Sequence, residues 1–442
     1  MHISILSVFP ELYTPFLQTS LVRRAQENGL VSYEVVPFHS VCAPKERIDA
    51  PTFGHGAGML IRPEVVDRAV QHAEDGHGPS FKIFFSPQGK PLTQYDVKRF
   101  AQKLQEGKHL MLVAARYEGM DARVEEHYAD ALVSVGDFVL MGGDIPAMMV
   151  LEGLLRHIPG VVGRQESVQE DSFTGPFFDY PEYTAPVVWH EKEVPEVVRS
   201  GDHGRLREWR LDQAARKTVM SRFDWLRTIS MPQEYKKLVT KHIPPHYAVL
   251  MHDEVLVGGR EPIKGTTSVT SLDIHDIARS SCTYGIKNYC IVTPLLDQQR
   301  IVQQLTDFWM QGAGIAYNEH RHRSLESFRL LNSFEQVVDL VEEQEGQKPL
   351  VVATSARAVD RDAIKPECVI TYHDQDLIWQ QERPVILVLG TGQGLTRDFV
   401  ARCDYLLVPL EGFTDFNHLS VRSAAAIIFD RWLGSNIKFI RE

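Results

Sequence analysis

The sequence predicts an α/β protein built from two parallel-sheet domains with helices between them. In residues 1–163, and again after residue 247, short β-branched and aromatic runs alternate with helical stretches. Because parallel strands need crossover connections, which are usually helical, this alternation favours mainly parallel sheets with helices on their faces. A proline pair, Pro244 and Pro245, interrupts the intervening helices and marks the predicted start of the second sheet domain.

The expected strands are short and apolar. In the first half they cover residues 3–9, 33–37, 82–86, 110–115 and 131–135. In the second half they cover residues 247–251, 289–292, 350–353, 368–371, 385–389 and 405–408, all apolar enough to be buried on both faces. Between them, the Gly-, Pro- and Ser-rich residues 164–184 should form a loop. The predicted domains are therefore 1–163, a linker at 164–184, a helical subdomain at 185–243, and 247–442.

Composition narrows the protein class. The 442-residue chain is 43% hydrophobic, yet its apolar runs fall well short of the ~20 residues that cross a bilayer. It begins on a strand-like segment without a secretion signal, so we expect a cytoplasmic protein that does not contact a membrane. Five widely spaced cysteines without a CxxC pair argue against a disulfide framework or a zinc site, and no metal ligands are predicted.

One segment departs from the acidic average of the chain. The net charge of -11 disfavours a nucleic-acid partner, because Lys and Arg supply most non-specific affinity for phosphates. From Arg199 to Lys241, however, eleven Lys and Arg face five Asp and Glu, a local balance of +6. This segment predicts a phosphate-binding surface, with a solvated helical face as the alternative.

Three glycine-bearing segments follow expected strands: residues 86–89 (SPQG), 115–119 (ARYEG) and 134–143 (SVGDFVLMGG). Loops after parallel strands gather at the carboxyl edge of the sheet, where such sheets bind ligands. Glycine lets the backbone approach a ligand closely, so its N–H and C=O groups can bind an adenine edge. Together the segments predict a nucleotide-like ligand, although each one alone is more typical of an ordinary turn.

Four further segments complete an ordered series: residues 9–11 (FPE), 54–60 (GHGAGML), 157–163 (HIPGVVG) and 170–173 (EDSF). In order and spacing, the whole series resembles the TrmD family of tRNA (guanine-N1)-methyltransferases over roughly residues 1–240. The resemblance implies the SPOUT class, in which the parallel sheet carries a deep trefoil knot, a feature otherwise almost absent from proteins.

The resemblance also implies that the three loops form the knot and hold S-adenosyl-L-methionine in a bent shape. Backbone groups of Val135, Phe138 and Leu140 are expected near the adenine. The family usually has Cys-Gly where this sequence has Ala114-Ala115, so a methyl group at Ala115 narrows the expected pocket. The predicted cofactor-binding residues are Ser86, Pro87, Gln88, Gly89, Ala115, Tyr117, Glu118, Gly119, Val135, Gly136, Asp137, Phe138, Val139, Leu140, Gly142 and Gly143.

Two residues are expected to carry the chemistry that the resemblance implies. Neutral guanine holds a proton on N1 and is a poor nucleophile, so methyl transfer to N1 requires a base. Asp171 is expected to remove that proton, and Arg156 to stabilise the charge that develops on guanine O6. Without the resemblance, a capping aspartate and a surface arginine would be the simpler interpretations. Glu118 is a candidate for contact with the methionine end or with Mg²⁺, or else a structural carboxylate.

Family members are homodimers in which the knot of one subunit meets the EDSF loop and basic helices of the other. We therefore expect composite active sites, with residues 164–184 ordered over the substrate and residues 199–241 bound to a tRNA anticodon stem-loop. The implied target is the guanosine at tRNA position 37, immediately 3′ of the anticodon. A methyl group on N1 blocks its Watson–Crick donor, so the base cannot pair in the reading frame.

Residues 247–442 carry a fainter resemblance. Segments 273–280 (DIHDIARS), 389–396 (LGTGQGLT), 408–410 (VPL) and 417–426 (NHLSVRSAAA) are similar to motifs of SpoU-type SPOUT RNA methyltransferases. The middle motif lacks its usual Glu, so the alternative is a non-catalytic RNA-binding or dimerisation module. The candidate residues are Arg279, Gly390, Gly392, Gly394, Leu410, Asn417 and Ser420. The full expectation is two trefoil-knotted, parallel-sheet SPOUT domains with a small helical subdomain between them.

A metal-binding interpretation of Asp273, His275 and Asp276 competes with a capping role. We expect capping, because alternation along a strand would place neighbouring side chains on opposite faces. The basic run at residues 320–323 is equally consistent with phosphate contact and with a solvated loop.

Overall fold

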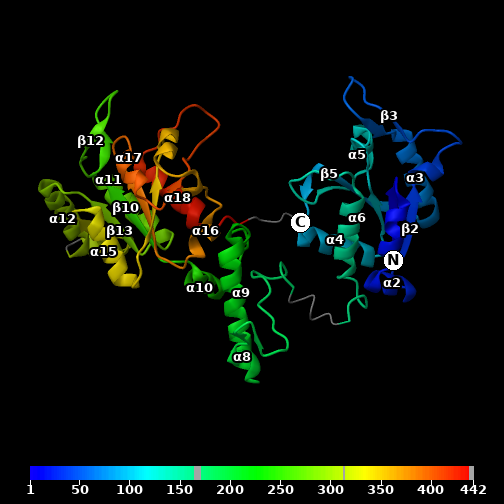
Figure 1. Ribbon diagram of the computed structural model, residues 1–442, viewed down its shortest axis with the longest axis horizontal. Coiled ribbons are helices and arrows are strands. Elements are labelled where there is room, and N and C mark those ends of the chain that lie inside the picture. The colour runs from blue at the N-terminus through cyan, green and yellow to red at the C-terminus, as the bar shows by residue number, and fades with distance from the viewer. Residues whose placement is uncertain (164–170, 312–313, 438–442) are drawn as a thin grey trace. The chain divides into compact units, whose positions relative to one another are not determined.

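The computed structural model describes residues 1–163, 171–311 and 314–437 (Figure 1). The chain divides into two compact units, Met1–Gly175 and Pro176–Glu442. The division falls within the expected linker, of which residues 164–170 lie outside the described part. None of the described helices is long and apolar enough to span a bilayer.

The first unit contains a five-stranded sheet in the order β2-β1-β6-β5-β7. All four strand pairs are parallel, as the sequence predicts. All five predicted strands are confirmed, within a few residues at their ends. They are β1 (His2–Ser7), β2 (Ser32–Pro37), β5 (Ser80–Pro91), β6 (His109–Val113) and β7 (Ala131–Ser134).

Strand alternation builds two cores, one on each face of this sheet. Leu110 and Leu112 of β6 lie in one core, while Met111 and Val113 lie in the other. Helices α4 (Gln94–Gln105) and α6 (Asp144–Leu155) cover the first face. Helices α3 (Pro63–His77) and α5 (Ala122–Tyr128) cover the second. This three-layer arrangement explains why β6 is buried along its whole length.

The second unit contains a seven-stranded parallel sheet in the order β14-β13-β10-β17-β15-β18-β16. The six strands expected here are confirmed, and β14 (Phe328–Leu331) is an additional edge strand. The others are β10 (His246–Met251), β13 (Asn288–Val292), β15 (Leu350–Thr354), β16 (Val369–Ile370), β17 (Val385–Gly390) and β18 (Tyr405–Leu407).

The two sheets share one strand topology. When the five strands of the first sheet are numbered along the chain, their spatial order is 2-1-4-3-5. Strands β13-β10-β17-β15-β18 of the second sheet repeat that order, and β14 and β16 are added at the two edges. The second half therefore has a design related to that of the first.

The basic helices pack onto the second sheet unit. This region contains a short hairpin of β8 (Val188–Trp189) and β9 (Lys192–Glu193), then α8 (Glu196–Arg199), α9 (His203–Leu226) and α10 (Gln233–His242). Val219 and Phe223 of α9 share a core with Trp379 of α16 (Gln375–Trp379) and Trp432 of α18 (Val421–Leu433). The Phe223 and Trp379 rings meet edge to face at 4.7 Å. In Figure 1, α9 adjoins α16 accordingly.

Polar contacts reinforce this attachment. The Arg227 guanidinium, just after α9, donates to the carbonyl oxygens of Asp430 and Arg431 near the end of α18. In return, the Asn436 N–H donates to the Arg227 carbonyl at 2.7 Å. The helical segment and the second sheet therefore form one compact unit.

Two buried histidines should make this unit sensitive to acid. His246 Nδ1 donates to the Pro244 carbonyl at 2.6 Å, and its Nε2 accepts from Trp432 Nε1 at 2.9 Å, so the ring is neutral. His252 is also fully buried. Burial lowers the pKa of each histidine from 6.5 to about 4. Between pH 6.5 and about pH 4, the histidines bind more protons in the unfolded chain than in the native state, so the unfolding free energy falls as the pH falls.

We expect each of these two histidines to remove on the order of 2 kcal/mol of unfolding free energy at pH 5, relative to pH 7.5. Urea unfolding followed by tryptophan fluorescence at the two pH values measures the loss. The variant His246→Gln should take up as much as one proton fewer on unfolding, so its unfolding free energy should depend less on pH. If the unfolding free energies of the wild type and this variant changed equally with pH, His246 would not be the source of the acid sensitivity.

Candidate functional site

A cavity of about 410 Å³ lies at the carboxyl edge of the first sheet. Its wall comes from the SPQG segment of β5 and from the loops that follow β6 and β7, which are the three segments that the sequence predicts. Of the sixteen predicted cofactor residues, all but Gly89 and Asp137 line it. The lining residues are Ser86, Pro87, Gln88, Ala115, Tyr117, Glu118, Gly119, Val135, Gly136, Phe138, Val139, Leu140, Gly142 and Gly143.

The SPQG segment is not a loop after a strand, which corrects the prediction. It lies inside β5, whose pairing with β7 shifts register between Phe85 and Lys90. This bulge turns Ser86, Pro87 and Gln88 toward the cavity. Gly89 does not line the cavity, and its glycine has a structural reason. A Cβ at Gly89 would lie 2.6 Å from the Val133 backbone of β7.

The loops after β6 and β7 contact each other through their backbones. The Gly143 N–H donates to the Ala115 carbonyl at 2.8 Å. A Cβ at Gly142 would lie 2.7 Å from the same carbonyl oxygen and 2.4 Å from Cδ of Arg116. Only glycine fits at position 142 without displacing one of the loops. The methyl group of Ala115 is nearly buried in the cavity wall.

The variant Gly142→Ala should therefore weaken S-adenosyl-L-methionine binding about tenfold, since overpacking a close contact costs roughly 1–3 kcal/mol. Isothermal titration calorimetry with the cofactor measures the change. Gly163→Ala is the matched control, because a Cβ there meets no atom of the described residues within 4 Å. Unchanged affinity in Gly142→Ala would show that the cofactor does not use this junction.

Asp144 holds the cavity loops together from beneath, a role that the sequence did not reveal. It begins α6 and its side chain is fully buried. One carboxylate oxygen accepts from Ser7 Oγ at 2.6 Å and Tyr13 Oη at 3.0 Å, and the other accepts from Arg116 Nε at 2.7 Å. These bonds join the end of β1, the ARYEG loop and the start of α6.

A short hairpin of β3 (Asp49–Pro51) and β4 (Met59–Ile61) borders the same loop. It carries the GHGAGML segment. The Glu118 N–H donates to the Met59 carbonyl, and the Ile61 N–H donates to the Gly119 carbonyl, both at 3.0 Å. The hairpin thereby fixes the cavity side of the ARYEG loop.

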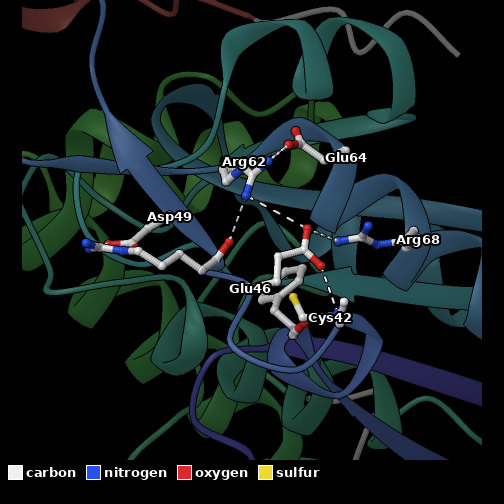
Figure 2. Close-up of polar contacts among 9 residues, drawn as sticks. Cys42, Glu46, Asp49, Arg62, Glu64 and Arg68 are labelled. Atoms are coloured by element: carbon white, nitrogen blue, oxygen red, sulfur yellow. Dashed lines mark hydrogen bonds and ion pairs between the residues drawn. The ribbon is translucent and has the colours of Figure 1, made fainter.

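Figure 2 shows the ion-pair network that holds the base of this hairpin. The Glu46 carboxylate accepts from Arg68 Nη2 and from the Ala43 N–H, each at 2.8 Å, and lies 3.8 Å from Arg62 Nη1. The Arg68 bond lowers the pKa of Glu46. Arg62 also donates to the Arg47 carbonyl at 3.2 Å. Glu46 therefore connects the hairpin to α3 through Arg68.

Two carboxylates face the cavity. Glu118 is exposed there, and Glu125 of α5 is a lining residue that the sequence analysis missed. Burial raises the pKa of Glu125. Carboxylate oxygens in a cavity lining are suited to a hard divalent cation or to a cationic ligand group.

The predicted catalytic pair is brought together, but outside the cavity wall. Arg156 caps the C-terminal end of α6, and its guanidinium donates to the Asp171 carboxylate. Both side chains remain partly exposed to solvent. Neither residue is among the described residues that line the cavity.

The second sheet has a similar glycine-bearing segment, in which Gly390 ends β17 and Gly392 and Gly394 lie in the loop that follows. The hairpin of β11 (Val255–Val257) and β12 (Ile263–Gly265) binds it, since the Leu256 N–H donates to the Gly394 carbonyl at 2.8 Å. This contact parallels the one between β3–β4 and the ARYEG loop. Both sheets therefore clamp a comparable loop with a short hairpin.

The other second-half candidates are placed at different points. Arg357 donates to the Leu395 carbonyl at 2.9 Å, and Asn417 donates to the adjacent Ala356 carbonyl at 3.3 Å, so Asn417 lies near the glycine loop. Ser420 is the N-cap of α18, and Leu410 packs at the edge of the core. Arg279 is exposed on α11 (Ser271–Thr283), a helix that packs against α18.

The strand interpretation of residues 273–276 is wrong, because they lie in α11. The N-cap of this helix is Thr270, which is not one of the three residues expected to cap. Thr270 Oγ1 accepts from the Asp273 N–H at 3.3 Å and donates to the Asp273 carboxylate at 2.6 Å, so Asp273 holds the capping side chain in place. Residues 320–323 likewise lie in a helix, α14 (Glu319–Leu325), rather than in a loop.

Comparisons with known proteins agree with this architecture. Residues 1–228 match the family model "tRNA (Guanine-1)-methyltransferase TrmD", and residues 246–434 match the model "SAM-dependent RNA methyltransferase". Proteins named tRNA (guanine-N(1)-)-methyltransferase from Oleidesulfovibrio alaskensis and Nitratidesulfovibrio vulgaris are each 37% identical over 98% of this chain and 99% of their own length. A protein of the same name from Thermus thermophilus is 41% identical over 50% of this chain and 90% of its own length.

The matches separate along the boundary between the halves. The Thermus protein resembles only the first half, whereas the two longer relatives align with both. The first model covers the cavity and the Arg156–Asp171 pair, and the two longer relatives cover 98% of the chain. The chain therefore belongs to the tRNA (guanine-1)-methyltransferase TrmD family.

Proposed function

We propose that the protein transfers a methyl group from S-adenosyl-L-methionine to N1 of the guanosine at tRNA position 37. The observation that carries this proposal is the single cavity lined by three separate, predicted cofactor segments. Family membership supports the reaction type. The shared 2-1-4-3-5 strand order supports a trefoil knot in each sheet.

The cofactor supplies an electrophilic methyl group, and the protein supplies the base. Asp171 removes the N1 proton of guanine, and Arg156 stabilises the negative charge that develops on O6. In the free chain these two groups pair with each other. Guanine binding therefore replaces a carboxylate–guanidinium contact with contacts to N1–H and O6.

The complete site is formed by two copies of the chain. Phe138, Val139 and Met141 beside the cavity, with Ile145 and Met149 on α6, expose large apolar side chains. A second copy that covered them would remove this surface from water. This second copy would also bring its residues 171–173 to the cavity of the first. Within one chain, neither Asp171 nor Arg156 lines the cavity.

The basic helix binds the substrate. The exposed residues Arg205, Arg207, Arg216 and Lys217 of α9 present positive charge to the phosphates of a tRNA anticodon stem. Glu118 and Glu125 would hold a Mg²⁺ ion through their carboxylates, and the ion would supply positive charge to the cavity.

The experiment compares two tRNA transcripts that differ only in the base at position 37. With labelled S-adenosyl-L-methionine, the G37 transcript should accept one methyl group, and the A37 transcript should be at least about 100-fold slower. Equal labelling of both transcripts would place the target elsewhere.

The second sheet domain is a further RNA methyltransferase with its own cofactor site. Its match to the RNA methyltransferase model and its clamped glycine loop favour this role over a docking module. Calorimetric titration of the full chain should then give two cofactor molecules per chain. One molecule per chain would favour the RNA-binding or dimerisation alternative.

A further inference from the structure

We propose that His2, Glu34 and His77 form a binding site for a first-row transition-metal dication of the Zn²⁺ class. The three residues come from the start of β1, the middle of β2 and the last residue of α3. One ligand atom from each lies within 4.8 Å of the others. The described cavity lies instead at the carboxyl edge of the same sheet, so the two sites are separate.

The distances suit a tetrahedral ion. The Nε2 atoms of His77 and His2 lie 3.4 and 3.9 Å from Oε2 of Glu34. Zinc–ligand bonds of about 2.0–2.1 Å require ligand atoms to be about 3.3 Å apart. The His2 and His77 rings are stacked with their centroids 3.3 Å apart, so one ring must rotate out of the stack before both Nε2 lone pairs can point at one ion. Water can complete the coordination sphere.

Hydrogen bonds at both ring nitrogens leave either tautomer of His2 open. His2 Nδ1 lies 2.8 Å from Ser32 Oγ, and His2 Nε2 lies 3.2 Å from Ser4 Oγ. In the Nδ1–H tautomer, Ser32 Oγ accepts from the ring and the Nε2 lone pair lies on the side of Glu34, which is the arrangement that a metal-ligating histidine needs. An imidazole lone pair and an acceptor-only carboxylate repel each other unless a cation or a proton lies between them.

Ser4 competes with the metal for His2 Nε2. His109 Nδ1 donates to the Gly78 carbonyl at 3.0 Å, so its Nε2 accepts the hydroxyl hydrogen of Ser4 at 2.9 Å. Ser4 Oγ can then only accept from His2 Nε2–H, at 3.2 Å, and metal binding would replace this hydrogen bond. The His2 and His77 rings are stacked at 3.3 Å, so placing a proton on both rings would juxtapose two positive charges.

The donor set selects the class of ion. Two imidazole nitrogens and one carboxylate oxygen suit Zn²⁺, Ni²⁺ or Co²⁺, whereas Mg²⁺ and Ca²⁺ prefer oxygen ligands throughout. The bound ion would connect β1 and β2 with the turn that leads from α3 into β5. Its role would be to stabilise the first unit, away from the reacting atoms.

Calorimetric titration of the untagged, EDTA-treated full chain with Zn²⁺ tests the proposal, using wild type, His77→Ala and His72→Ala. His72 is exposed on the same helix and serves as the matched control. We expect wild type and His72→Ala to bind one Zn²⁺ per chain with micromolar or better affinity, and His77→Ala to bind at least about 100-fold more weakly. Zinc should also raise the melting temperature of the first unit by several degrees in both wild type and His72→Ala, and should leave it unchanged in His77→Ala.

Equal zinc affinity in wild type and His77→Ala would overturn the proposal, as would wild-type binding weaker than about 100 μM. Either result would favour a proton shared between Glu34 and the stacked histidines. His77 is partly exposed, so its replacement should leave the metal-free chain folded, and circular dichroism checks this. Cofactor titration of His77→Ala should match wild type, which separates this outcome from failure of the methyltransferase assignment.

Discussion

The variant Asp171→Asn should lose methyl transfer to tRNA by about 10²- to 10⁴-fold, the range expected when a general base is removed. Asparagine keeps the shape of aspartate but cannot accept the N1 proton. Because Asp171 is proposed to contact guanine N1 and not the cofactor, S-adenosyl-L-methionine affinity should stay within about twofold of wild type. Single-turnover methylation with labelled cofactor measures the rate.

Glu182→Gln is the matched control for this variant. Glu182 is an exposed carboxylate in the segment that follows Asp171, and its amide should leave the rate unchanged. Arg156→Ala should slow the same step, because it removes the proposed stabilisation of O6. Wild-type rates in Asp171→Asn would remove this residue from the mechanism without affecting the cofactor assignment.

The variant Trp379→Ala should destabilise the second unit by about 3–5 kcal/mol, the usual cost of truncating a buried tryptophan. Trp379 is fully buried and packs against Phe223 of α9 and Trp432 of α18. The cavity would loosen α9 from the sheet domain. We therefore also expect weaker tRNA binding, although Trp379 has no positive charge to offer a phosphate.

Two measurements separate these effects. Urea unfolding reports the stability of the second unit, and cofactor binding to the first unit should be retained. Trp189→Ala serves as control, because Trp189 is 64% exposed and its loss should change stability by no more than about 0.5 kcal/mol. Unchanged stability in Trp379→Ala would contradict the shared core of α9 and the second sheet.

The sequence was informative wherever structure depends on local pattern. Buried parallel strands are continuous apolar runs, so β6, β10 and β17 were visible without any tertiary information. The edge strand β14 was missed because Arg329 interrupts it and much of it is only partly buried. The SPQG segment looked like a turn because proline and glycine are rare inside strands, and a bulge admits both.

Other errors had a recoverable signal. Ile274, Ile277 and Ala278 are buried at helical spacing, which could have identified α11 in place of a strand. By contrast, Asp144 was out of reach, because its partners Ser7 and Tyr13 are more than a hundred residues away along the chain. The proposed metal ligands are also far apart in the sequence and belong to no local motif. The Asp144 contacts and the proposed metal site depend on tertiary contacts, which a local sequence pattern does not encode.

Identification of the methylated nucleotide tests the central claim most directly. After reaction with wild-type protein, nuclease digestion and mass spectrometry of the tRNA should find 1-methylguanosine at position 37. With Asp171→Asn that nucleoside should be absent or reduced by the factor given above. Methylation of a different nucleotide by wild type, or undiminished 1-methylguanosine at position 37 with the variant, would contradict the account.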